Sequence, residues 1–221
     1  MSYFTAEFHS FLKGLSENNN REWFEDHKPT YIKEVKEPFK ALVGDVIDRM
    51  RSHEPRIQMT PNQAVFRIYR DVRFSKDKSP YKPHASAFVC SDGKKSGNPG
   101  FYFQLSHREL FVGGGKWSLD KETLHKIRTE IVYSPEEFQN IVTDKNFTKT
   151  YGELKGDKNK ILPKEFREDA EKQPLLFHKQ YLFQRSMNAK VILKDNLLDT
   201  LLEHYITGKP LIDFLQRALD D

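Results

Sequence analysis

The sequence predicts an α+β protein in which helices from both ends of the chain pack on a central antiparallel sheet at about residues 64–113. Two observations carry this prediction. Apolar residues recur every three or four positions before residue 52 and after residue 117, and they alternate with polar residues in between. The 221 residues contain no repeat, no low-complexity tract and no linker, so we predict one domain over residues 1–221.

The N-terminal third predicts helices with recognisable starts. Thr5 is placed to cap a first helix and Asn20 a second one, because short polar side chains accept hydrogen bonds from the free N–H groups of a helix start. A long amphipathic helix then begins near Tyr31. We expect Pro38 to kink or reset it, since proline lacks the N–H that an α-helix needs.

The middle and the C-terminal parts predict the remaining elements. Strands are expected near residues 64–72, 84–90, 100–106 and 109–113, with a polar loop at 92–100 and a hairpin turn at 106–108. Helices are expected at 118–131, capped by Ser118, and at 135–143, where Ser134 opens a capping box. The lysine-rich residues 146–164 should be irregular. The C-terminal third predicts a helix at 174–181, a strand at 182–186, and helices at 196–207 and 210–219 that break at Gly208 and Pro210.

Composition excludes several classes of protein. One cysteine, Cys90, allows no intramolecular disulfide and is read as a small buried residue in a reducing compartment. The N-terminus lacks the features of a signal peptide, and no apolar run approaches the roughly 20 residues that span a bilayer. The histidines show no HxxxH or HExxH spacing. We therefore expect a soluble cytoplasmic protein with no membrane partner, no metal and no cofactor, and the sequence leaves the oligomeric state open.

The net charge of +4 is concentrated in one segment, residues 66–84. This segment carries six cationic and two acidic residues, and six minus two equals the +4 of the whole chain. The cations are Arg67, Arg70, Arg73, Lys76, Lys78 and Lys82, and the acids are Asp71 and Asp77. A local excess of positive charge predicts a local anionic ligand. The pI near 8.9 is only mildly basic, so nucleic acid is a weakly supported partner.

Side-chain alternation indicates how the segment is arranged. In a strand, Arg67 and Arg73 share a face with Asp71, and two guanidinium groups on one face suit bidentate binding of phosphate or carboxylate. Arg70 falls on the apolar face and has to reach a partner or the edge of the sheet. The predicted ligand-binding side chains are those of Arg67, Arg70, Arg73, Lys78 and Lys82.

Three sequence blocks occur together in a fixed order. They are residues 19–24 (NNREWF), residues 66–82 (FRIYRDVRFSKDKSPYK) and residues 113–115 (GGG). This combination resembles the uncharacterised family catalogued as domain of unknown function 2461, and the resemblance covers nearly the whole chain. It implies a single domain and supplies no catalytic residues.

The glycine block forms a second candidate site. Gly113, Gly114 and Gly115 precede a predicted helix, and consecutive glycines can direct backbone N–H groups at one anion. Lys116 and Trp117 would lie at the rim of such a nest. The alternative is a tight turn between a strand and a helix, where only glycine fits.

Three hypotheses remain for the function. The preferred one is a module that binds a phosphorylated or polyanionic ligand through the basic segment. The second is an enzyme that acts on a phosphorylated substrate or on nucleic acid, with Asp71, Tyr81 or His84 transferring protons. The third is a scaffold in which the basic segment is an internal ion-pair lattice. No nucleophile–base pair in the sequence favours the second over the first.

Overall fold

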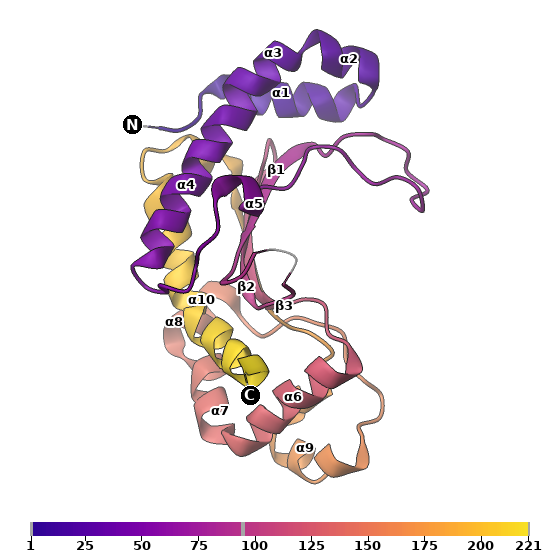
Figure 1. Ribbon diagram of the computed structural model, residues 1–221, viewed down its shortest axis with the longest axis vertical. Helices are drawn as coiled ribbons and strands as arrows, with labels where there is room; N and C mark the ends of the chain where they lie inside the picture. The colour runs from indigo at the N-terminus through magenta and orange to yellow at the C-terminus, as the bar shows by residue number, and fades with distance from the viewer. Residues whose placement is uncertain (1, 94–95, 221) are drawn as a thin grey trace. The chain divides into compact units, whose positions relative to one another are not determined.

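The computed structural model describes residues 2–93 and 96–220, and it confirms an α+β fold (Figure 1). An antiparallel four-stranded sheet has the order β1-β2-β3-β4. Its strands are β1 (His84–Val89), β2 (Gly100–Ser106), β3 (Glu109–Lys116) and β4 (Tyr181–Asn188). The expected strand at 64–72 is wrong, because that stretch makes only isolated bridges. The polar loop expected at 92–100 includes residues 94 and 95, which lie outside the described residues.

The chain divides into two compact units, and each is described by itself. The first comprises Met1–Lys94, Tyr102–Val112 and Ser186–Leu202. The second comprises Lys95–Phe101, Gly113–Arg185 and Glu203–Asp221. The boundaries fall inside strands β2, β3 and β4, so these strands run from one unit into the other. That the chain forms one domain stays a prediction.

The first unit contains the N-terminal helices (Figure 1). They are α1 (Ala6–Glu17), α2 (Arg21–Asp26), α3 (Lys28–Thr30), the π-helix η1 (Tyr31–Lys36), α4 (Glu37–Arg51) and α5 (Pro61–Ala64). Both expected caps are confirmed: Thr5 Oγ1 accepts the N–H of Glu7 at 3.2 Å, and Asn20 Oδ1 accepts that of Trp23 at 2.9 Å. The π-helix ends at Lys36, and α4 begins at Glu37 with Pro38 in its first turn, so the expected reset occurs there.

Phenylalanine dominates the core of the first unit. Phe8, Phe24, Phe39 and Phe103 are almost fully buried, and the rings of Phe39 and Phe103 lie 5.8 Å apart. Cys90 is buried as expected. The long amphipathic helix therefore contributes its apolar face to this core, where burial of each large side chain stabilises the fold by roughly 1.5–3 kcal/mol.

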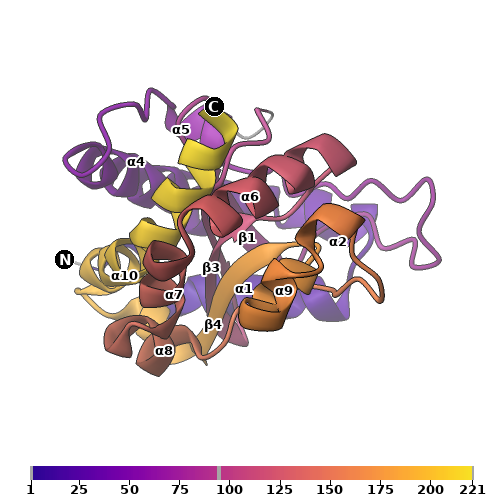
Figure 2. The same ribbon diagram turned by 90° about the horizontal axis from the view of Figure 1, so that it is seen from below.

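The second unit contains short helices that connect β3 to β4 (Figure 2). They are α6 (Lys121–Tyr133), α7 (Pro135–Thr143), α8 (Lys145–Tyr151), η2 (Lys164–Phe166), α9 (Asp169–Lys172) and η3 (Pro174–Phe177). Helix α7 matches its predicted range. The cap of α6 is Asp120 instead of Ser118, and the hydroxyl of Ser134 donates to Glu130 instead of forming a capping box. Residues 174–177 form a 3-10 turn, so the helix expected at 174–181 is wrong.

The sequence did not predict helix α8 (Lys145–Tyr151), because the lysines among its residues obscure the helical spacing of the two apolar ones. Asp144 caps it by accepting the N–H groups of Asn146 and Phe147, both at 2.9 Å. Phe147 and Tyr151 lie one turn apart and are both buried, whereas the charged residues around them are exposed. The segment expected to be irregular therefore begins with an amphipathic helix.

The C-terminal helix α10 (Leu197–Asp220) is continuous through Pro210, so the predicted break at Gly208 is wrong. A Cβ atom on Gly208 would lie 2.1 Å from Cζ of Phe183. The glycine is therefore needed for close approach of α10 to the aromatic ring, and it does not end the helix.

Candidate functional site

The basic segment forms a long irregular hairpin, which we call the arm and define as residues 65–82. Its two sides are joined by backbone hydrogen bonds from Arg70 N to the Pro80 carbonyl (2.9 Å) and from Lys82 N to the Ile68 carbonyl (2.8 Å). Pro80 and Pro83 have no N–H to donate, so the returning side cannot build a continuous ladder. This explains why alternation predicts a strand here and the chain forms only the bridges Val65–Ala87 and Tyr69–Tyr81.

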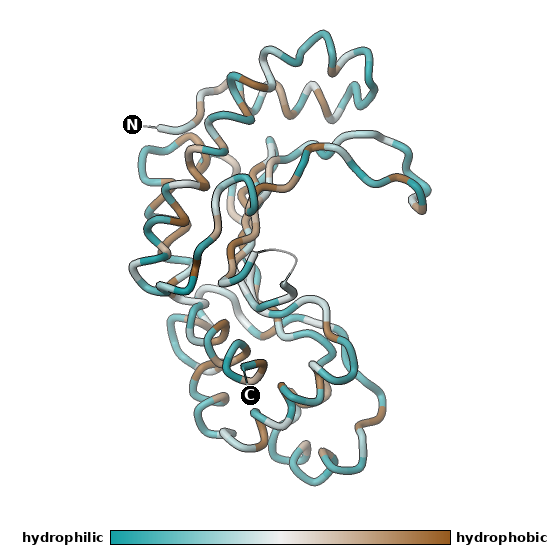
Figure 3. Tube along the Cα trace, viewed as in Figure 1, coloured by the Kyte–Doolittle hydropathy of each residue, from teal (hydrophilic) through white to brown (hydrophobic). Residues whose placement is uncertain are grey.

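The arm extends away from strand β1 and the N-terminal helices of its own unit (Figure 1). Its trace is hydrophilic over most of its length (Figure 3). Four of its six cationic residues are exposed, namely Arg67, Arg73, Lys76 and Lys78. The arm therefore presents its charge to solvent along a projecting segment.

The base of the arm is held by the N-terminal residues. Asn19 donates from Nδ2 to the carbonyl of Tyr81 at 2.9 Å and accepts the Tyr81 N–H on Oδ1 at 3.0 Å. The ring of Tyr81 stacks on Phe24 with centroids 4.1 Å apart and an interplanar angle of 18°. Two blocks that are far apart in the sequence, 19–24 and 66–82, thus meet at one point. The sequence did not predict this contact between Asn19 and the arm.

Two of the three arginines form ion pairs inside the arm. Arg70 Nη1 contacts Asp77 Oδ2, and Arg70 also reaches the Ser79 carbonyl at 3.3 Å, as expected for an arginine on an apolar face. Arg73 binds Asp71 with two bonds, Nε–Oδ1 at 3.0 Å and Nη2–Oδ2 at 2.7 Å. The hydrogen bonds from Arg73 lower the pKa of Asp71 to about 2. The arm therefore contains two separate ion pairs, and among the described residues the third arginine, Arg67, takes part in neither.

Two of the three lysines of the arm donate hydrogen bonds to backbone carbonyls. Lys78 Nζ donates to the Val72 carbonyl at 3.0 Å, and Lys82 Nζ donates to the Arg67 carbonyl at 3.1 Å. Since the arm has six cations and only two carboxylates, and both carboxylates contact arginines, four positive charges exceed the acids of the arm. The local excess predicted from the sequence therefore persists in the folded arm.

Phe74 is the functional candidate that sequence reasoning missed. In a strand Phe74 would share the apolar face of Arg70, yet its side chain is 96% exposed, and Tyr69 is 48% exposed. The guanidinium of Arg73 lies 5.8 Å from the centre of the Phe74 ring. A large aromatic residue between an arginine and a run of polar residues, Ser75-Lys76-Asp77, was the available signal. An exposed phenyl ring next to cations suits stacking on a flat ligand.

The three candidate proton-transfer residues have different surroundings. Asp71 is held ionised by Arg73, and Tyr81 is 2% exposed and stacked on Phe24. Burial, with a smaller effect of Lys82, lowers the pKa of His84 to about 4. The pocket beside His84 measures about 30 Å³, whereas substrate sites are roughly 300–1,000 Å³. Within the described residues, no hydrogen bond joins Asp71, Tyr81 and His84 to one another.

The three glycines lie inside strand β3, in the part of it that belongs to the second unit, so the turn between a strand and a helix at this place is wrong. All three are buried. A Cβ on Gly114 would lie 2.4 Å from Phe183 Cζ and 2.7 Å from the Gly100 carbonyl oxygen. Gly115 has φ +103°, and a Cβ there would lie 2.1 Å from the carbonyl oxygen of Tyr181. A side chain at Gly114 or Gly115 would clash with these neighbours, so glycine is needed at both positions for close packing, and Gly113 lies in the same strand. That the glycine block binds an anion stays a prediction, and the proposal below does not use it.

Comparison with known protein families finds a match over most of the chain. A family model described as "Conserved hypothetical protein (DUF2461)" matches residues 7–214. No curated protein matches the chain, and neither does any solved structure. Among the described residues, none of the helices is long and apolar enough to cross a membrane.

Proposed function

Because the chain belongs to the family of conserved hypothetical proteins DUF2461, a description that names no activity, we propose a function from its own geometry: the arm binds a polyanionic ligand. The observation that carries this proposal is the excess of four positive charges on one projecting hairpin. These charges are spread over an arm of 18 residues, so they suit a ligand whose negative charges are also spread out.

The exposed ring of Phe74 favours single-stranded nucleic acid among the polyanions. Single strands offer phosphates for the cations and unpaired bases on which an aromatic ring can stack. Polyphosphate and sulfated polysaccharides offer the charges alone, and a duplex hides the faces of its bases. Arg73 and Phe74 are adjacent, so one nucleotide can contact both through its phosphate and its base.

The two ion pairs of the arm favour a second candidate, a scaffold role for the arm. Arg70 is 27% exposed and contacts Asp77, Ser79 and Ser75, so it fixes the outer turn of the hairpin. We assign Arg70 to this structural role and the more exposed Arg67, Arg73, Lys76 and Lys78 to the ligand. A scaffold alone accounts for the ion pairs and for the carbonyl bonds of Lys78 and Lys82, but it does not require the exposed charges of Arg67 and Lys76.

The proposal is tested by measuring the binding of a labelled oligothymidylate of about 12 nucleotides by fluorescence anisotropy at several salt concentrations. For wild-type protein, log K should fall linearly with log salt, with a slope of about −0.7 for each phosphate contacted. Lys76→Ala should weaken binding and reduce the slope by about that amount. Lys13→Ala, which removes one exposed lysine on helix α1, is the matched control and should have no effect.

Two further variants separate binding from a scaffold role. Asp71→Asn should strengthen binding, since it releases Arg73 and removes a negative charge, whereas a scaffold predicts only a loss of order in the arm. Phe74→Ala should weaken the binding of oligothymidylate more than it weakens the binding of inorganic polyphosphate of equal charge. A flat salt response in wild type, or equal effects of Lys13→Ala and Lys76→Ala, would overturn the proposal.

A further inference from the structure

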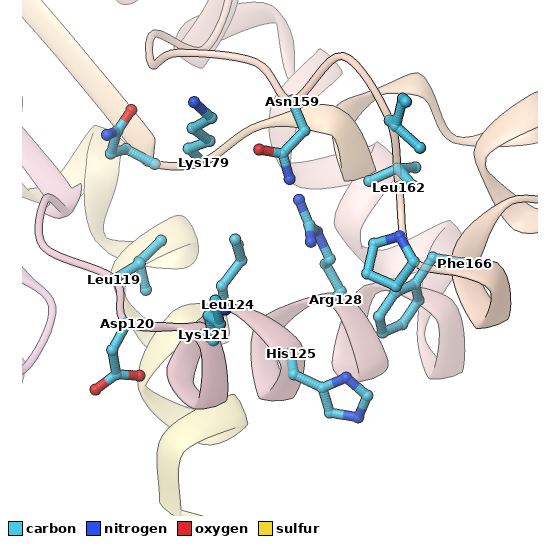
Figure 4. A pocket seen from close by; sticks show the side chains of 13 residues that line it. Leu119, Asp120, Lys121, Leu124, His125, Arg128, Asn159, Leu162, Phe166 and Lys179 are labelled. Carbon is cyan, nitrogen blue, oxygen red and sulfur yellow. The ribbon is translucent and has the colours of Figure 1, made fainter.

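The second unit holds an open pocket of about 710 Å³ against helix α6 (Figure 4). This volume is in the range of small-molecule sites, roughly 300–1,000 Å³. Figure 4 shows the side chain of Arg128 rising from α6 toward Asn159, with Leu124 and Phe166 on either side of it. The pocket contains no residue of the arm, so a role for it is independent of polyanion binding by the arm.

Arg128 is the central feature of this pocket, because its side chain is charged and the residue is only 3% exposed. Its Nε donates to the Leu176 carbonyl at 2.9 Å and its Nη2 to the His178 carbonyl at 3.3 Å, and the hydroxyl of Tyr181 lies beside it. Over residues 2–93 and 96–220, no carboxylate lies within ion-pair distance of this guanidinium. A buried charge whose partners are all uncharged is costly, and an anionic ligand would offset that cost.

The rest of the wall is cationic and apolar. Lys121 and Lys179 are exposed there, and the one carboxylate in the wall, that of Asp120, accepts the Thr123 N–H at 2.7 Å as a helix cap. Lys121, Arg128 and Lys179 minus Asp120 give the lining a formal charge of about +2. Apolar contacts come from Leu124, Leu162, Pro163 and Phe166.

We infer that this pocket binds a small amphipathic anion, meaning a carboxylate or phosphate group on a compact apolar body. The anionic group contacts Arg128 and Lys179, and the apolar body packs on Leu124 and Phe166. The guanidinium of Arg128 lies 5.9 Å from the centre of the Phe166 ring, so a single small molecule can touch both. A ligand of this kind balances the buried charge and also covers apolar side chains of the wall, among them Ile161, which is 75% exposed.

A purely structural role for Arg128 predicts a different outcome. The two carbonyl bonds tie helix α6 to the segment that begins with η3, and the spacing of Leu124, Arg128 and Ile131 places the arginine on the buried face of α6. If Arg128 is only a tie, its replacement lowers stability and the wild-type pocket binds no anion.

An NMR titration with three probes distinguishes these roles. The probes are phenyl phosphate, inorganic phosphate, which lacks the ring, and benzyl alcohol, which lacks the charge. The Nε–H resonance of Arg128 and the backbone amides of the lining residues report binding. Phenyl phosphate should shift these signals saturably and bind at least about tenfold more tightly than either partial probe, since tenfold corresponds to only 1.4 kcal/mol. Phenylacetate should shift the same signals if the pocket accepts carboxylates.

Variants on the pocket wall complete the test. Lys179→Ala removes an exposed cation without touching the core and should weaken phenyl phosphate binding about tenfold. Lys126→Ala, on helix α6 but outside the wall, is the matched control and should bind as wild type does. The inference is overturned if phenyl phosphate causes no saturable shift at about 20 mM, if benzyl alcohol binds equally well, or if Lys179→Ala has no effect. If Arg128→Gln is less stable and the wild type binds no anion, Arg128 has only a structural role.

Discussion

Asn19 should control whether the base of the arm stays closed. Its side-chain amide makes the two hydrogen bonds that a residue of a neighbouring strand would make with Tyr81: it donates to the Tyr81 carbonyl and accepts from the Tyr81 N–H. Asn19→Ala removes both bonds, and the methyl group that remains cannot bond to the backbone. We therefore expect the hairpin to open locally more often in this variant, with Tyr81 as the reporting residue.

The expected magnitude depends on the two hydrogen bonds. A typical intramolecular hydrogen bond contributes about 0.5–1.5 kcal/mol net, so the loss of two lowers the free energy of opening by about 1–3 kcal/mol. If opening is local, the amide of Tyr81 should exchange with solvent about 5- to 160-fold faster. If the loss instead acts on global unfolding, a chain of this length should melt about 2–12 °C lower.

Native-state hydrogen exchange measured by NMR or mass spectrometry is the assay. Asn18→Ala is the matched control, because Asn18 Nδ2 bonds the Gly14 carbonyl at the end of α1 and does not touch the arm. Asn19→Asp keeps the acceptor for the Tyr81 N–H but places a carboxylate oxygen against the Tyr81 carbonyl, so exchange should also rise. Unchanged exchange at Tyr81 in Asn19→Ala, with unchanged melting, would refute the reasoning.

Three further substitutions test the packing and the pH dependence. Gly114→Ala should lower stability by about 1–3 kcal/mol, because its Cβ would lie 2.4 Å from Phe183 Cζ; thermal unfolding measures this loss. Gly44→Ala in helix α4 should instead raise stability by about 0.5–1 kcal/mol, because its Cβ would meet nothing nearer than 3.6 Å; equal losses in both variants would contradict the argument. Burial and Lys82 hold the pKa of His84 at about 4, below its usual 6.5, so the unfolded chain binds the proton more readily. Stability should fall as pH drops from 6.5 toward 4, and His84→Gln should flatten that fall in denaturant titrations.

Local signals predicted the elements whose local and tertiary preferences agree. Thr5 and Asn20 cap helices as expected, and the alternating residues of β2 form a strand with the predicted bounds. In these segments the hydrophobic period and the end signals point to the same structure, so no distant contact is needed to choose between alternatives.

Tertiary contacts decided the elements that the sequence did not predict. Gly208 and Pro210 resemble a helix stop, but the glycine admits the ring of Phe183 and the helix continues. The outgoing side of the arm alternates like a strand, but the prolines of the returning side prevent a ladder. A short stretch of sequence contains only one partner of such a contact. The other partner, which decides between helix, strand and loop, lies elsewhere in the chain.

The candidate site shows the same division. The positive excess was predicted because charge is local in the sequence, whereas the ion pairs depend on how the hairpin turns. Asp77 lies seven residues from Arg70, and only the turn brings the two together. Arg128 was not predicted, since a single arginine on the apolar face of a helix indicates nothing until its partners are known.

The ion-pair lattice and ligand binding are compatible, because exposure divides the arginines between them. Arg70 is largely covered and bonded to the outer turn. If it gave up these bonds to contact a ligand, the hairpin would become disordered. The side chain of Arg73 is 76% exposed and its partner Asp71 is 47% exposed, and ion pairs of this kind contribute little because water already screens them. Arg73 can therefore leave Asp71 for a phosphate at small cost, while Arg70 and Asp77 keep the arm in place. The paired arginines thus do not argue against a binding role for the arm.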